Sequence, residues 1–168
     1  MFDVLAFVYE NYWRANACPQ AAQLERKLTA VGFESNEIQD ALVWLEGLSL
    51  MAQGWAPEQE NTPTTQDLPE RSAPTPASAS AMRVYSVAEQ DHLGRDGLGL
   101  LSFLESAQAL SGPLREIVVD RAMASSTSPL SLDDLKIIVL LVYWRLDQEP
   151  AALVLDELCT EQIGRITH

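Results

Sequence analysis

Basic residues are scarce in this 168-residue sequence. It has 11 Lys and Arg against 24 Asp and Glu, which gives a formal net charge of -13 at pH 7. A field of this sign repels the phosphate backbone of nucleic acids and anionic lipid surfaces. We therefore expect neither nucleic acid nor a membrane as the partner, and consider an unidentified protein instead.

Cysteines and long apolar runs are also few. Cys18 and Cys159 lie at opposite ends of the chain and outside any CxxC motif, so neither a zinc site nor a disulfide framework is predicted. The longest apolar run, residues 137–144, is far shorter than the roughly 20 residues that span a bilayer. Asp3 and Glu10 stand where a secretory signal carries basic residues. These absences predict a cytoplasmic protein with reduced thiols.

Catalytic and ligand-binding motifs are missing as well. His92 and His168 are the two histidines and make no ligand set, and no GxSxG or HExxH motif occurs. The glycine-rich stretch at residues 94–99 has neither the GxGxxG order nor the lysine of a phosphate loop. Its small residues are better explained by close approach of a helix to its neighbour. The sequence predicts a non-enzymatic protein with no catalytic, cofactor-binding or metal-binding residues and no cofactor.

What the sequence does contain is a mostly α-helical pattern in three parts. Residues 1–55 and 82–168 carry apolar residues at helical spacing. Between them, residues 56–81 are rich in proline and poor in apolar side chains, which predicts a flexible linker or wing tip. The run at 135–144 is apolar on every side and needs cover, so we expect the second region to pack on the first.

The first region is expected to form a three-helix, helix-turn-helix-like unit. Gly32 supplies the left-handed residue that ends the second helix. Segments 50–55 and 82–85 have the short patterns typical of strands, and their pairing would make the unit winged-helix-like. Irregular chain in both segments is the equally weighted alternative. The expected helices are residues 2–14, 19–31 and 35–48.

The second region is expected to form four helices. Ser86 with Glu89, and Ser131 with Asp134, have the spacing of capping boxes, in which a side chain satisfies the free N–H groups of a helix start. The four expected starts are after Ser86, at Pro113, after Ser131 and at Pro150.

Tryptophans are the candidate contact residues. Trp44 lies off the helical face that Ile38 and Leu45 define, so we expect it to be exposed, and an exposed Trp is a typical interface anchor. Trp13 and Trp55 are further candidates. The alternative for Trp44 is burial under the linker or against the second region. The leading hypothesis is a regulator or adaptor that works by protein–protein contact.

A winged-helix-like nucleic-acid-binding regulator is the alternative function. Recognition helices reach bases with Arg, Lys, Asn and Gln, and the third helix has only Asn36 and Gln39 to offer. Arg14, Arg26 and Lys27 are the one basic cluster in the first region. This scarcity disfavours the alternative.

A dense charge cluster is expected at LREIVVDRA. Arg115, Glu116, Asp120 and Arg121 are close enough in sequence for a structural ion-pair network at a helix interface. A ligand site is less favoured, because acid–base chemistry needs a histidine, a metal or a cleft beside such carboxylates.

Several collinear blocks resemble the bacterial Smg family across nearly the whole chain. The resemblance implies a cytoplasmic protein of proteobacterial type whose molecular function is unassigned, and it transfers no catalytic or binding residues. The blocks are MFDVLAFVYENYW, LTAVGFESNEIQDALVWLEGL, MRVYS, LREIVVDRAMA, LSLDDLKIIVLLVYW and the ending Ile166, Thr167 and His168.

Overall fold

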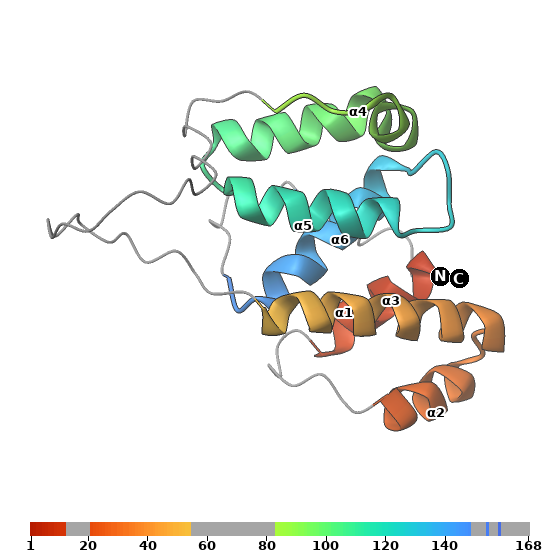
Figure 1. Cartoon of the computed structure of the whole chain (residues 1–168). Helices are drawn as coiled ribbons and strands as arrows, with labels where there is room; N and C mark the ends of the chain where they lie inside the picture. The colour runs from red at the N-terminus through yellow and green to blue at the C-terminus, as the bar shows by residue number, and fades with distance from the viewer. Residues whose placement is uncertain (13–20, 55–82, 149–153, 155–157, 159–168) are drawn as a thin grey trace, which may run out of the picture.

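The structure is a computed structural model that describes residues 1–12, 21–54 and 83–148, together with residues 154 and 158. All regular secondary structure in these residues is helical, which confirms the mostly α-helical prediction and makes the described part of the chain all-α. Figure 1 shows α4 above α5 and α6, with α1 and α3 below them and α2 at the bottom. The helices are α1 (Phe2–Tyr12), α2 (Ala21–Val31), α3 (Ser35–Gln53), α4 (Val87–Ser106), α5 (Gly112–Met123) and α6 (Leu132–Arg145).

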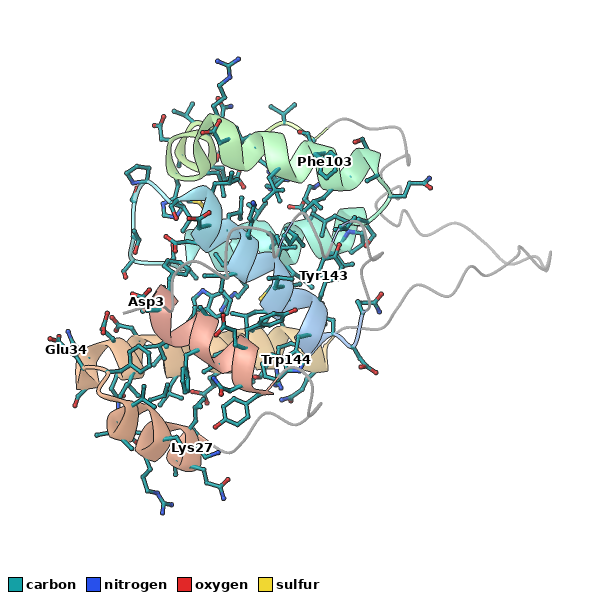
Figure 2. All side chains as sticks on the ribbon, turned by 180° about the vertical axis from the view of Figure 1, so that it is seen from behind. Asp3, Lys27, Glu34, Phe103, Tyr143 and Trp144 are labelled. Carbon is teal, nitrogen blue, oxygen red and sulfur yellow. The ribbon has the colours of Figure 1, made fainter. Side chains whose placement is uncertain are left out.

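The centre of the fold is α6. Every residue from Asp134 to Tyr143 is buried. Asp134 and Lys136 are the charged residues in this buried stretch, and apolar side chains point to every side of the helix. Such a helix needs neighbours all round, and α1, α3, α4 and α5 all pack against it. Figure 2, seen from behind, shows α6 crossing between α4 and α1, with Tyr143 on it. Helices from both halves of the chain therefore contribute to one hydrophobic core.

The start of α4 has the full capping box that the sequence predicts, and the start of α6 has the predicted Ser131 cap. At α4, the Glu89 backbone N–H donates to Ser86 Oγ at 3.3 Å, and the Ser86 N–H donates to the Glu89 carboxylate at 2.7 Å. At α6, the Asp134 N–H donates to Ser131 Oγ at 3.1 Å. These caps satisfy N–H groups that have no partner inside the helix.

The turn between α2 and α3 is built on Gly32. Its φ of 108° is a left-handed conformation that favours glycine. The N–H groups of Gly32 and Phe33 both donate to the Leu28 carbonyl at 3.2 Å, which is a Schellman-type helix end. The Phe33 ring packs edge-on against Phe7 at 5.7 Å, so the turn also ties α2 and α3 to α1.

Of the two equally weighted alternatives, the wing is wrong where the structure describes it, and irregular chain is correct for residues 83–85 but wrong for residues 50–53. Residues 50–53, expected to begin a strand at 50–55, are the last turn of α3. They stay helical because Met51 and Ala52 continue the core-facing side of the helix and pack against the core. Residues 83–86 have no regular secondary structure, so the described parts of the two segments form no hairpin.

The glycine-rich stretch bends α4 and brings it close to α6. Gly94 has a φ of 66° and a ψ of 177°, so the helix axis kinks there. A methyl group on Gly97 would lie 3.1 Å from Leu135 Cδ2, whereas Gly99 faces open space. The expected close approach is confirmed at Gly97.

Several expectations fall outside the described residues. They concern the linker at 56–81, the side chains of Trp13 and Trp55, and most of the helix expected from Pro150. Of that last helix, Val154 and Leu158 are described, and both are helical and buried. Among the described helices, none combines the length and the apolar character that crossing a membrane would require.

Candidate functional site

One cluster of charged side chains in the described part of the chain joins the start of α5 to both ends of α4. We call it the Arg83 network: Arg83, Glu89, Glu105, Arg115 and Glu116. Arg83 donates to Glu116 from both Nε and Nη2 at 2.8 Å, and Nη2 also donates to Glu89 at 2.8 Å. Arg115 donates to Glu116 at 2.8 Å and also binds Glu105. The charges alternate along the cluster, so each carboxylate contacts a guanidinium.

Hydrogen bonds in the Arg83 network lower the pKa of two of its carboxylates, those of Glu89 and Glu116. Hydrogen bonds from the Arg83 side chain and the Ser86 backbone lower the pKa of Glu89 to about 2. Burial acts to raise the pKa of Glu116, but the hydrogen bonds from Arg83 and Arg115 outweigh it and the pKa is lowered. Carboxylates with such low pKa values are poor proton donors or acceptors near neutral pH. The ion pairs of Arg83 instead hold the segment that precedes α4 against Glu89 of α4 and Glu116 of α5.

Asp120 and Arg121 form a separate pair farther along α5. Arg121 donates to Asp120 Oδ2 from Nε at 3.0 Å and from Nη2 at 2.6 Å. The guanidinium also lies against Gly47 of α3, where a methyl group would come within 2.2 Å of Nη1. The four charged residues expected to cluster are thus divided: Arg115 and Glu116 join the Arg83 network, and Asp120 and Arg121 lie at the crossing of α3 and α5.

Trp44 is buried at the same crossing. Only 4% of its surface is exposed, and its indole N–H donates to the Arg121 carbonyl at 2.9 Å. The expectation that Trp44 is an exposed anchor is therefore wrong, and burial against the second region is correct. The reason is that α5 covers this side of α3 and supplies an acceptor for the indole.

His92 and Ser125 are the described residues that come closest to a catalytic pair. His92 Nε2 lies 3.2 Å from Ser125 Oγ and 3.0 Å from the Ala122 carbonyl oxygen. A carbonyl oxygen can only accept, so Nε2 must carry the hydrogen and cannot act as a base toward the serine. Both side chains are buried, and the Leu130 N–H donates to the His92 carbonyl at 2.8 Å. His92 thus joins α4 to the end of α5 and the following loop.

The side of α3 that points away from the core carries two large aliphatic side chains. Val43 is 67% exposed and Leu50 is 63% exposed. Seven residues are about two helical turns, so the two side chains lie in line along the helix. Asp40 and Glu46 are also exposed and flank this line. We call these four residues the outward face of α3.

Sequence reasoning missed the outward face of α3 and three of the five residues of the Arg83 network. Leu50 was assigned to a strand, which hid its helical spacing from Val43. The network draws in Arg83, Glu89 and Glu105 from other segments. Glu89 could have been found, because its capping role already placed it at the start of α4.

The described residues contain no group of three or more His, Cys, Asp and Glu side chains that could hold a metal ion. The Arg83 network is acidic in part, but its carboxylates bind guanidinium groups. Among the features above, the outward face of α3 has the exposure that contact with another molecule needs.

Known proteins similar to this chain agree on one family. The family model described as "Protein of unknown function (DUF494)" matches residues 1–168. The Protein Smg homolog of Methylibium petroleiphilum is 51% identical over 168 residues and that of Leptothrix cholodnii 50%, each match covering 100% of both chains. The Protein Smg homolog of Bordetella avium is 44% identical, with the same coverage. No solved structure is significantly similar. The chain therefore belongs to the Smg family.

Proposed function

We propose that this protein is a non-enzymatic regulator or adaptor of the cytoplasm that works by protein–protein contact through the outward face of α3. The observation that carries the proposal is the exposed pair Val43 and Leu50. Single exposed aliphatic residues are common on protein surfaces. Two in line along one helix are the arrangement by which a helix packs against a partner.

The rest of α3 supports this assignment. Its opposite side is fully occupied by core contacts through Ile38, Ala41, Leu45 and Leu48. The helix is held on α5 by Trp44 and on α6 by a hydrogen bond of 2.6 Å from Arg145 to Ser49. A surface mounted on a rigid helix loses little conformational entropy when a partner binds.

The nucleic-acid alternative has weaker support. The carboxylates of Asp40 and Glu46 would lie against phosphates if α3 entered a groove. Asn36 and Gln39 are exposed, but no Arg or Lys occurs between Ser35 and Gln53. The wing that the alternative needs is replaced by helix at residues 50–53.

Quantitative co-purification of the full chain with matched variants tests the proposal. The test variant is Val43→Glu/Leu50→Glu. The control is Val84→Glu/Val87→Glu, which replaces two valines that are 88% and 73% exposed outside α3. Both variants lose two exposed aliphatic side chains and gain two negative charges, and both are expected to melt like the parent.

At least one protein captured by the parent and by the control should be lost from the Val43→Glu/Leu50→Glu variant, and its direct binding to the purified parent should be measurable. The proposal is overturned if the two variants capture the same proteins in the same amounts. It is also overturned if both lose the partner equally, because the effect would then come from charge and not from α3.

A further inference from the structure

The charges around Val43 and Leu50 indicate what chemistry the partner presents. Asp40 and Glu46 form a negative rim on the two sides of the aliphatic line. The helix from Ser35 to Gln53 has no basic residue to balance it. Two guanidinium groups from other helices lie against this helix. Arg121 lies at Gly47, but its Nε and Nη2 atoms donate to Asp120. Arg145 donates to the Ser49 hydroxyl and not to Glu46. A matching partner therefore has aliphatic side chains bordered by positive charge.

A second copy of this chain does not meet that requirement. Two copies related by a twofold axis would place the same surface patch on itself. The carboxylates of Asp40 and Glu46 would then face their own equivalents, and like charges across an interface cost free energy. The net charge of -13 adds to this repulsion.

The spacing of the aliphatic pair favours a helical occupant. Val43 and Leu50 are about 10.5 Å apart along the axis, at a rise of 1.5 Å per residue. A helix lying along α3 repeats its own side chains with that same seven-residue period, so two of them can pack on Val43 and Leu50 together. Side chains on one face of a strand recur at about 6.6–6.8 Å and do not match this distance.

We propose that the outward face of α3 binds a basic amphipathic helix of another protein. Aliphatic side chains of that helix pack on Val43 and Leu50, and its Lys or Arg side chains lie opposite Asp40 and Glu46. This inference rests on the proposed function and adds the class of partner. The contact spans two helical turns, which is less than a standard interface, so it is a weak and reversible one.

A designed peptide provides the test. The probe is a fluorescent 18-residue peptide of Lys and Leu, with Leu at helical spacing, and its counterpart has Glu in place of each Lys. Anisotropy titrations use the full chain, an Asp40→Lys/Glu46→Lys variant and an Asp91→Lys/Asp96→Lys control. Asp91 and Asp96 are exposed on α4, so the control makes the same change in net charge elsewhere on the surface. The milder variant Asp40→Asn/Glu46→Gln guards against misfolding.

The basic peptide should bind the parent, and the acidic one should not. Reversing two flanking charges should weaken binding by about tenfold, and the milder variant by about threefold, as expected for two exposed ion pairs. The α4 control should change binding by less than about twofold at physiological salt, where distant charges are screened.

Equal weakening in the α3 and α4 variants would overturn the inference, because binding would then follow overall charge. Absence of peptide binding, or equal binding of both peptides, would overturn it as well. The two proposals fail separately. A cellular partner that is lost with Val43→Glu/Leu50→Glu but retained with Asp40→Lys/Glu46→Lys would leave the proposed function standing and refute the basic helix.

Discussion

Two helices of this protein, α6 and α3, are both rich in large aliphatic side chains but use them differently. In α6, all ten residues from Asp134 to Tyr143 are buried. In α3, one side is buried in the same core, while Val43 and Leu50 on the other side are about two-thirds exposed. Aliphatic residues thus stabilise the fold in α6, and in α3 they also form a surface. The difference separates the residues that hold the structure from those available for contact.

The largest expected effect comes from removing volume inside α6. Leu141 is fully buried, and Leu141→Ala should lower the free energy of unfolding by about 3 kcal/mol, since it loses transfer free energy and leaves a cavity. Urea titration of the full chain measures this. A loss of less than about 1 kcal/mol would mean that α6 is not the closely packed centre that the structure describes.

The Arg83 network should contribute less, in a way that depends on pH. Arg83→Gln removes the hydrogen bonds to Glu89 and Glu116 and should cost about 1 kcal/mol at pH 7, because the pairs are partly exposed. The lowered pKa of Glu89, about 2, means that its contribution is present above the ordinary glutamate pKa of about 4.3 and disappears as pH falls toward 2.

Urea titrations of the parent and Arg83→Gln at pH 7, 4 and 2.5 check this, with Arg95→Gln on the exposed side of α4 as the control. The difference between parent and Arg83→Gln should shrink below pH 4.5. A difference that stays constant over this range would contradict the assigned pKa shift.

Tyr143 should give an effect of similar size at the alkaline end. Its hydroxyl donates to the Ala109 carbonyl at 2.5 Å, so Tyr143→Phe should cost about 1 kcal/mol at pH 8. Burial raises the pKa of Tyr143 to about 12. The folded state then keeps its proton where the unfolded state loses it, so this residue lowers stability as pH rises from about 10 to 12. The parent should lose stability over that range faster than Tyr143→Phe, and parallel curves would refute the assignment.

The smallest expected effect completes the comparison of the two helices. Leu50→Ala makes the same chemical change as Leu141→Ala, but on the outward face of α3. Because Leu50 is already exposed, the free energy of unfolding should change by less than about 0.5 kcal/mol. A loss approaching that of Leu141→Ala would show that Leu50 is covered in the native protein and is not available to a partner.

The features that were predicted correctly from the sequence are set by residues close to one another along the chain. The caps at Ser86 and Ser131 and the turn at Gly32 are each set within a few positions of the chain. The central role of α6 was also predictable, because a helix that is apolar on every side has no solvent-facing side to offer.

The features that were missed depend on residues far apart. Trp44 is buried because α5 brings a carbonyl from 77 positions away to its indole. Arg83 donates a hydrogen bond to Glu116, which is 33 positions away in the sequence. The sequence of the last turn of α3 has a strand-like pattern, but Met51 and Ala52 pack on the core and the segment is helical. Local patterns carry no information about these tertiary partners, and tertiary packing commonly overrides local propensity.

The most direct test of the central claim is site-specific photo-crosslinking in the bacterial cells that express the protein. A photoreactive residue replaces Val43 in one strain and Val84, which is also exposed, in the other. The account predicts a discrete covalent adduct with another protein from position 43 that is absent from position 84. Equal adducts from both positions, or none from position 43, would contradict the assignment of the outward face of α3 as a contact surface.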